Sequence, residues 1–391
     1  MSSRFAPSLI LMILISTPST FLISPQPAIN RPFTQEARRF LVNAGETNVT
    51  IAVVDSISEK FAITINNNGG IYNIRISQMN FTNAGGWFIW FNAWQQLYGS
   101  NATSKPIVEE KQDYVSATFF AQYQAYPLAI VTNMIVSKNG VILINTNLTA
   151  VEDASGIIQI GWGFWFFPFS LFGGRYAEVC REGTVIRVEL PAEYNSAFTS
   201  FYDTSRSTSW MDFSTISEGL TMINIAPSLF TGFAIGDNRN ATSTDETFNA
   251  HFRLTGWGKG AMKKNEMRTA RIALYIHEPG GYETNKDMID LIVKIGETED
   301  KAINAMTTYR SSSAKDFARQ ALLSARSAYE KIFAGNVFSA KSLLEEALDL
   351  IKRAEDAENS AVIVNNLLWL IPLLIIVATI IIIYVRRKKR R

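Results

Sequence analysis

Acidic, basic and aromatic side chains that suit carbohydrate chemistry gather between residues 201 and 240. They are Asp203, Arg206, Trp210, Asp212, Asp237 and Arg239. An indole ring has a flat apolar face that can stack on a sugar ring, and carboxylates accept hydrogen bonds from hydroxyl groups. Two carboxyls on opposite sides of a glycosidic bond can also cleave it. We therefore predict a sugar-binding site in this stretch, with glycoside cleavage and a solvated loop as the alternatives.

Histidine and cysteine are too sparse to indicate a metal site or a nucleophilic enzyme. The chain has two histidines, His251 and His277, and one cysteine, Cys180. A zinc site needs three or four such ligands, and the sequence contains no phosphate-binding loop and no nucleophile elbow. We predict that both histidines are structural, that Cys180 packs as a small apolar residue, and that the chain uses no metal and no cofactor.

The segment that must position these side chains has the pattern of a large β domain. Between Asn48 and His277, short β-branched and aromatic runs alternate with turn residues. Asn67-Asn68-Gly69-Gly70 and Ser137-Lys138-Asn139-Gly140 each join two such runs and suit tight hairpins. About a dozen strands separated by regular turns predict a mainly β fold, with a large antiparallel β-sandwich over residues 48–282.

The richest aromatic run, Gly161–Phe169, has the sequence GWGFWFFPF. Rings stand at both odd and even positions, which indicates a strand covered on both faces and therefore central in its sheet. A sugar-stacking platform is one interpretation of this run. Burial in the core is the interpretation that we favour for most of its rings.

Three segments resemble the galactose-mutarotase-like supersandwich. They are Phe61–Ile76, Asn139–Pro168 and Ser209–Asn238, and the resemblance extends from Asn48 to about Glu278. The first has the paired glycines of an opening hairpin, the second leads from a turn into the aromatic strand, and the third contains Trp210-Met211-Asp212. The resemblance implies a supersandwich-like fold of the kind found in sugar epimerases, in domains of glycoside hydrolases and in polysaccharide lyases.

The resemblance does not extend to the epimerase catalytic histidines. The epimerases use a histidine in an Asn-His-rich strand as general acid, and the corresponding segment here, Asn145–Ala150, has no histidine. We therefore leave open whether the chain is an enzyme and favour a binding protein. Any activity would be hydrolase-, lyase- or epimerase-like.

The pattern changes from β to helical after Glu278-Pro279-Gly280-Gly281. Apolar residues at helical spacing predict helices over Asn285–Ile295, Ser312–Ala334 and Val337–Glu358. Gly335-Asn336 is a typical helix stop, so the last two helices should form an antiparallel hairpin. We predict a small helical hairpin or bundle, residues 283–358, that acts as a stalk.

The two ends of the chain predict a single-pass membrane protein. Residues 1–28 are typical of a secretory signal peptide, and residues 29–47 are expected to be a linker. The segment 361–385 contains the uncharged run LLWLIPLLIIVATIIIIYV, which is long enough to cross a bilayer as a helix. The tail 386–391 consists of six Arg and Lys residues and is therefore expected in the cytoplasm. The β domain would then be extracellular.

Net charge and acceptor motifs fit this location. The net charge is +2, and six positive charges lie in the tail, so the remainder is slightly acidic and nucleic acid is not an expected partner. Candidate glycosylation sites follow the Asn-x-Ser/Thr rule. They are Asn48, Asn80, Asn101, Asn147 and Asn240.

The sequence thus predicts a cell-surface protein whose β-sandwich binds carbohydrate or a surface glycoprotein. A second hypothesis is a structural anchor or stalk, because the overall layout is also similar to that of membrane-anchored stalk proteins of archaeal surface layers. A third is an ecto-enzyme that acts on glycans. A concave face lined by tryptophan, arginine and carboxylates would favour binding, and two facing carboxyls would favour cleavage.

Overall fold

The computed structural model describes residues 38–91, 95–96, 100–123, 126–194, 200–203, 207–225, 230–240, 246–254 and 260–388. The chain divides into two units, residues 1–36 and 37–391, and every described residue belongs to the second. The predicted signal peptide lies outside the described residues.

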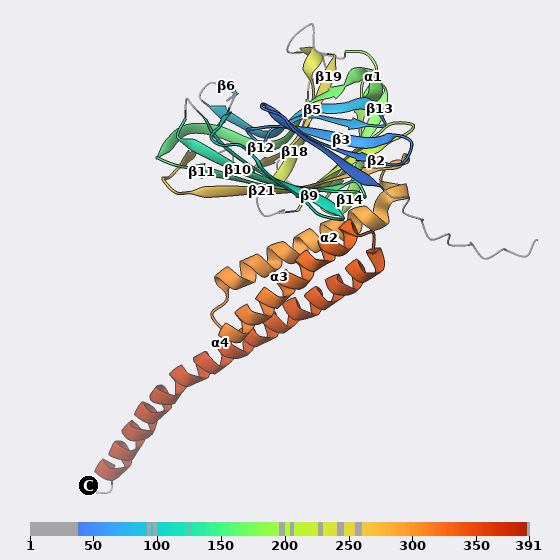
Figure 1. Cartoon of the computed structure of the whole chain (residues 1–391). Helices are drawn as coiled ribbons and strands as arrows, with labels where there is room; N and C mark the ends of the chain where they lie inside the picture. The colour runs from blue at the N-terminus through green and yellow to red at the C-terminus, as the bar shows by residue number, and fades with distance from the viewer. Residues whose placement is uncertain are drawn as a thin grey trace, which may run out of the picture. The chain divides into compact units, whose positions relative to one another are not determined.

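Two antiparallel sheets form the described β domain (Figure 1). The strands of sheet A are β1 (Arg39–Ala44), β2 (Asn48–Val54), β3 (Glu59–Asn66), β4 (Ile71–Ile76), β5 (Met79–Phe91), β6 (Gln95–Gln96), β12 (Ala154–Pro168), β15 (Ser200–Asp203), β18 (Phe230–Asp237), β19 (Thr247–Leu254) and β20 (Gly260–Met262). The strands of sheet B are β7 (Ser100–Ala102), β8 (Ile107–Glu110), β9 (Tyr114–Tyr123), β10 (Leu128–Ser137), β11 (Val141–Ala150), β13 (Arg175–Arg181), β14 (Thr184–Leu190), β16 (Thr208–Ser214), β17 (Gly219–Asn224) and β21 (Met267–His277).

The strand order places sequence-distant strands side by side. Sheet A runs β1-β2-β3-β4-β5-β12-β19-β18-β15, with β6 on β5 and β20 on β12. Sheet B runs β14-β13-β16-β17-β21-β11-β10-β9-β7, with β8 on β9. The aromatic strand β12 pairs with β5 on one side and β19 on the other, so the predicted central position is confirmed. Both predicted hairpins are confirmed too, and Gly69 and Gly140 have positive φ angles there.

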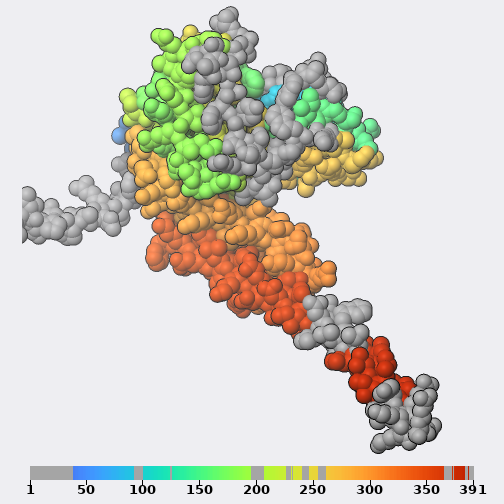
Figure 2. Space-filling view, turned by 180° about the vertical axis from the view of Figure 1, so that it is seen from behind, coloured from blue at the N-terminus to red at the C-terminus, as the bar shows by residue number. Residues whose placement is uncertain are grey.

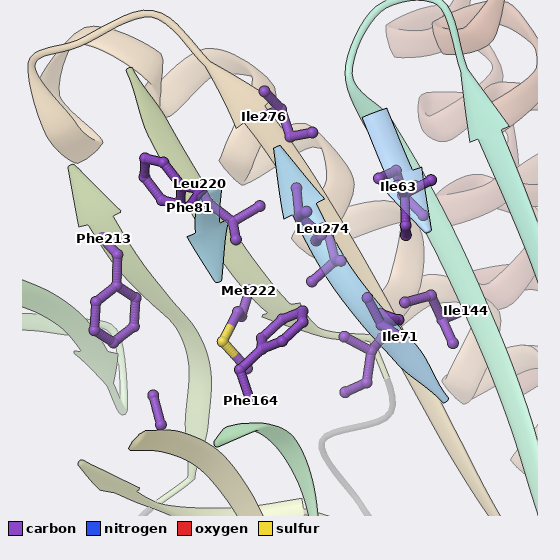
Figure 3. Packing of buried hydrophobic residues seen from close by; sticks show 14 of the residues in the cluster. Ile63, Ile71, Phe81, Ile144, Phe164, Phe213, Leu220, Met222, Leu274 and Ile276 are labelled. Atoms are coloured by element: carbon purple, nitrogen blue, oxygen red, sulfur yellow. The ribbon is translucent and has the colours of Figure 1, made fainter. Parts of the chain in front are cut away.

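The main core lies between the sheets because strand residues alternate between a buried and an outward side. Figure 3 shows Ile63, Ile71 and Phe81 of sheet A near Leu274 and Ile276 of sheet B. Phe167 of β12 stacks on Phe213 of β16, with ring centroids 4.1 Å apart. Burying one such side chain stabilises the fold by about 1.5–3 kcal/mol.

Three helices follow the sandwich: α2 (Gly281–Thr308), α3 (Ser312–Phe333) and α4 (Val337–Lys388). A short helix, α1 (Phe169–Phe172), and a 3-10 helix, η2 (Asn238–Asn240), lie within the β domain. Figure 2 shows the orange surfaces of α2 and α3 and the red surface of α4 in contact. Both ends of α3 have a local cause. At the start, the Ser311 side chain accepts a hydrogen bond from the Ala314 amide, and after the end Gly335 takes a positive φ.

The helices pack on the outward side of sheet B through a second apolar cluster. It joins Trp210, Ile223 and Ala273 of the sheet with Ile292 of α2 and Tyr329 of α3. Polar contacts reinforce the junction. The Asn139 side-chain amide, at the tip of the β10–β11 hairpin, donates to the carbonyls of Ile332 (2.8 Å) and Phe333 (2.9 Å) at the end of α3.

The structure differs from the sequence prediction at several boundaries. The sandwich begins at β1, inside the segment predicted to be a linker, because the run from Phe40 to Val42 pairs with β2. The predicted helix Asn285–Ile295 is part of a longer helix, α2, which packs with α3 and α4, so the bundle alternative of the prediction is the one observed. The predicted helix Val337–Glu358 and the predicted span 361–385 belong to one helix, α4.

Among the described residues, no helix has an apolar stretch long enough to cross a membrane. Within the predicted span, the side chains of residues 365–371, 373, 384 and 385 lie outside the described set.

Candidate functional site

The residues predicted to form a sugar site fall into two separate groups. Trp210 and Asp212 lie on β16 of sheet B, whereas Asp237 ends β18 of sheet A and Arg239 follows in η2. Asp203 ends β15, but its side chain and all of Arg206 lie outside the described residues. The structure therefore does not bring the four described side chains together in one site.

Trp210 and Asp212 belong to the junction between the sandwich and the helices. Trp210 is buried and stacks on Tyr282 of α2, with centroids 4.6 Å apart and an interplanar angle of 22°. Asp212 is also buried and accepts hydrogen bonds from Thr221 (2.7 Å) and Ser214 (2.8 Å). Neither side chain presents a surface on which a sugar could stack.

His277 completes this polar group at the junction. Its Nε2 lies 2.8 Å from Asp212 Oδ1, and its Nδ1 lies 2.7 Å from the carbonyl oxygen of Glu278. Both ring nitrogens thus have partners, and the side chain is buried. The prediction of a structural histidine is confirmed for His277.

Asp237 and Arg239 form an ion pair with each other. Arg239 Nη2 lies 2.6 Å from Asp237 Oδ2, and its Nε donates to Asp237 Oδ1 at 2.9 Å. The guanidinium also stacks over the Phe169 ring at 4.2 Å and donates to the Pro191 carbonyl. Both partners use their hydrogen-bonding groups within the fold, so this pair has a structural role in the arrangement seen here.

The candidate glycosylation sites differ in accessibility. Asn80 and Asn101 are exposed, and Asn48 is half-buried. Asn147 is half-buried and its Oδ1 accepts a 2.7 Å hydrogen bond from Thr269. The Asn240 side chain lies outside the described residues. Asn80 and Asn101 are therefore the better acceptors by exposure.

A different group of side chains lies on the outward face of sheet A. Phe248, Ala250 and Phe252 of β19 point into the core between the sheets, so the intervening residues of this strand point away from it. We call the group on that outward face the His251 cluster; it comprises Phe88, Trp90, Gln159, Trp165, His251 and Arg253.

Strand register brings the members of the His251 cluster together. Gln159 pairs with Trp90, Gly161 pairs with both Phe88 and Arg253, and Gly163 pairs with His251. Position 163 requires glycine because β12 and β19 approach each other closely there: a Cβ at this position would lie 2.5 Å from the Cβ of His251. The ring of Phe88 lies 5.4 Å from that of His251 and 5.6 Å from that of Trp165.

Electrostatics fix the state of His251. Arg253 Nε donates to His251 Nε2 at 2.9 Å, and the guanidinium lies 5.7 Å from the Trp90 ring centre. Burial, and to a lesser degree the Arg253 charge, hold the pKa of His251 well below its usual range. The imidazole is therefore neutral near pH 7. Because Nε2 accepts, the proton resides on Nδ1.

Several polar atoms of the His251 cluster are buried without a hydrogen-bond partner in the described structure. They are Nδ1 of His251 and both amide atoms of Gln159, whose side chain is 1% exposed. Most buried polar groups in proteins are paired, and each exception calls for an explanation. A donor N–H, a donor–acceptor amide and aromatic rings are side-chain groups that can bind sugar hydroxyls and apolar sugar faces. Phe88, Trp90, Gln159 and His251 are buried, whereas Trp165 and Arg253 are half-buried.

Sequence reasoning missed the His251 cluster although β12 carries a signal of it. Gln159, Gly161 and Gly163 alternate with Ile160, Trp162 and Phe164, and such alternation separates an outward polar stripe from a core stripe. The bulge at 164–167 then shifts this alternation. Among the described residues, no set of three or more His, Cys, Asp and Glu side chains is placed to hold a metal ion.

The chain was compared with known proteins by sequence and by structure. No protein-family model matches it, and no curated protein matches it in sequence. Among solved structures, it is similar to a galactose 1-epimerase from Lactobacillus acidophilus, at 7% identity over 62% of this chain and 99% of the epimerase, with a TM-score of 0.37.

Two further solved structures are glycoside hydrolases. A glycosyl hydrolase family 38 protein from Enterococcus faecalis has 11% identity, over 60% of this chain and 31% of that protein, with a TM-score of 0.40. A GH36 α-galactosidase from Geobacillus stearothermophilus has 9% identity, over 61% and 34%, with a TM-score of 0.32. These similarities are of overall shape, at low sequence identity.

Proposed function

We propose that this chain is a single-pass cell-surface protein whose β-sandwich binds carbohydrate, free or on a glycoprotein, at the His251 cluster. The observation that carries the proposal is the set of unpaired buried atoms on Gln159 and His251 beside Phe88, Trp90 and Trp165. A sugar hydroxyl can both donate to the Gln159 oxygen and accept from the Gln159 nitrogen or from His251 Nδ1. Trp165 and Arg253 are half-buried and form the accessible edge of the cluster.

The chemistry of the His251 cluster supports binding over cleavage. Glycoside hydrolysis needs a proton donor and a second carboxylate. The described part of the cluster contains no carboxylate, and His251 is neutral with Nε2 already accepting from Arg253. A neutral imidazole with its remaining N–H directed at a ligand can orient a hydroxyl, but it has no spare proton to give at neutral pH.

The proposed membrane anchor rests on the C-terminal part of α4. Its described apolar side chains between Leu374 and Ile383 are each 46–64% exposed, and they include Ile375, Ile376, Val377, Ile380, Ile381 and Ile382. Because successive helix positions differ by about 100°, these residues cover every side of the helix. A helix that is apolar all round belongs in lipid or in a protein interior, and six basic residues follow it. The helices α2 and α3 with the first part of α4 then form the stalk.

Carbohydrate binding is tested on the full chain held in lipid nanodiscs and applied to a glycan array. We expect selective binding that is lost, by tenfold or more, in Gln159→Leu and in Trp165→Ala. Gln122→Leu is the matched control, because Gln122 is an exposed residue of β9 on the other sheet. Binding to no glycan at all would overturn the proposal and favour the structural surface role.

Membrane anchoring is tested by alkaline carbonate extraction of cell membranes. The intact chain should stay in the membrane pellet. The double variant Ile376→Arg and Ile380→Arg should be released, because each arginine near the centre of a span costs about 2.5–3.5 kcal/mol. An intact chain found in the soluble fraction would contradict the anchor, and a protease-accessible basic tail on sealed cells would contradict the orientation.

A further inference from the structure

A second candidate site is a cavity that reaches between the sheets and shares Phe88 and Trp165 with the His251 cluster. The cavity, of about 510 Å³, opens beside the β3–β4 hairpin. Protein interiors leave few voids larger than one water molecule, and small-molecule pockets measure about 300–1,000 Å³. The cavity is therefore far larger than a packing defect and has the size of a ligand site.

The backbone of sheet A creates the cavity. Strand β4 begins at Ile71, which pairs with Gly85, so the part of β5 beyond Gly85 has no β4 neighbour. Ala84 and Gly86 of β5 have φ angles of 53° and 147°, and β12 has a register shift between Phe164 and Phe167. Irregularities in two adjacent strands open the sheet at this point, and such bulges are frequent next to binding sites.

Paired glycines keep the opening free of side chains. Gly69-Gly70 and Gly85-Gly86 both line the cavity, and a Cβ built on Gly86 would lie 3.8 Å from the Cα of Gly70. Two segments that carry no side chains thus face each other at the wall. A Cβ on Gly86 would meet no closer atom than this one, whereas a Cβ on Gly85 would clash with Phe164.

The walls are mostly apolar, with a few polar atoms at defined positions. Trp87, Trp162, Ile130 and Ile144 supply apolar surface. Thr132 and Thr146, both buried, place hydroxyls on the sheet B side. Nε1 of Trp87 is buried and has no acceptor in the described structure. A buried indole N–H normally finds a partner, so this donor is available to a ligand.

We propose that the cavity binds a small, flat amphipathic molecule through a hydrogen-bond acceptor placed at Trp87 Nε1. The apolar body of the ligand packs against Trp162, Ile130 and Ile144, and the acceptor is a carbonyl, ether or hydroxyl oxygen. The donor that this inference uses, Trp87 Nε1, is not part of the His251 cluster, because the ring of Trp87 packs toward Phe230 of the core between the sheets. Gln159 and His251 do not line the cavity, so a failure of glycan binding at these two residues leaves this inference standing.

The test uses Prodan, a flat naphthalene that carries a carbonyl acceptor and fluoresces according to its surroundings. The full chain in nanodiscs is titrated, with protein-free nanodiscs as the blank for partition into lipid. We expect a saturable component with one Prodan per chain and a blue-shifted emission. A second probe, 2-acetylnaphthalene, keeps the acceptor and shortens the body, and should displace Prodan.

Three variants locate the binding. Trp87→Phe keeps most of the ring but removes the donor and should weaken Prodan about fivefold to tenfold. Ile144→Phe should fill the cavity and abolish the saturable component, provided that its circular dichroism spectrum matches the parent. Trp210→Phe is the matched control outside the cavity and should leave the affinity unchanged. Absence of saturable binding of both probes, or equal affinity in Trp87→Phe and the parent, would overturn the proposal.

Discussion

The two histidines of this chain lie in opposite situations on the outward faces of the two sheets. His277, on sheet B under the helices, has a partner on each ring nitrogen. His251, on sheet A, has Arg253 on Nε2 and no partner on Nδ1 in the described structure. Burial is nearly equal, at 6% and 2% exposure. The difference is therefore in pairing.

The contrast between His277 and His251 distinguishes buried polar groups that are structural from those that could have a function. A buried polar group with all its hydrogen bonds made is part of the fold, whereas one left unpaired costs stability and calls for an explanation, such as a bound water or a ligand. The helix junction is not wholly paired, since Nη1 of Arg271 also has no partner there. That guanidinium nevertheless contacts Glu299, which also pairs with Arg326 at 2.9 Å. Gln159 has no contact of this kind on either amide atom.

The largest effect is expected from breaking the His277 group. Asp212→Ala leaves His277, Thr221 and Ser214 without their shared buried acceptor, and removing one partner of such a group costs about 3–5 kcal/mol. Urea unfolding of the full chain, followed by circular dichroism, measures the loss. Asp212→Asn retains one acceptor oxygen and should lose less. A cost below about 1 kcal/mol for the alanine variant would show that the paired junction is not the source of stability assumed here.

A smaller loss is expected at the hairpin tip that contacts α3. Asn139→Ala removes two hydrogen bonds to the last carbonyls of the helix, which should cost about 1–3 kcal/mol. Hydrogen exchange of the α3 amides near Ile332 should rise with the loss of thermal stability. Asn139→Asp has the same size but cannot donate, and its charge opposes the helix C-terminus. If the aspartate variant were as stable as the parent, the hairpin would not anchor the helix.

The third effect is a pH dependence of stability to which His251 should contribute. Its pKa is lowered in the fold, whereas in the unfolded chain it should be about 6.5. Below that pH the histidine is protonated in the unfolded state but stays neutral in the folded state. The free energy of unfolding therefore falls as the pH drops, by at most about 1.4 kcal/mol per pH unit. Thermal unfolding from pH 7.5 to 5 measures this slope. His251→Gln should flatten it, and an unchanged slope in that variant would contradict a neutral buried His251.

The sequence predicts the elements better than it predicts which side chains meet. Alternation and turn residues suffice for strands such as β10 and β11, because local residues determine period and hairpin. The strand β1 was missed because its burial is one-sided and depends on pairing with β2. Asp212 and Asp237 are close in sequence but lie on different sheets, and no local pattern shows this. The His251 cluster requires the register of β5, β12 and β19, which only the tertiary fold supplies.

The smallest expected effect is a gain in stability, opposite in sign to the losses above. It is also the most direct test of whether Gln159 belongs to a binding site. Gln159→Leu replaces an amide whose two polar atoms are buried and unpaired. Removing that desolvation cost should raise the free energy of unfolding by about 1 kcal/mol, while glycan binding is lost. Gln122→Leu, on the exposed face of β9, should change neither quantity appreciably. If Gln159 is retained for function, its replacement should give a more stable variant that no longer binds glycan. A destabilised variant would instead place Gln159 among the structural residues, as Asp212 is, and the contrast between the two faces would disappear.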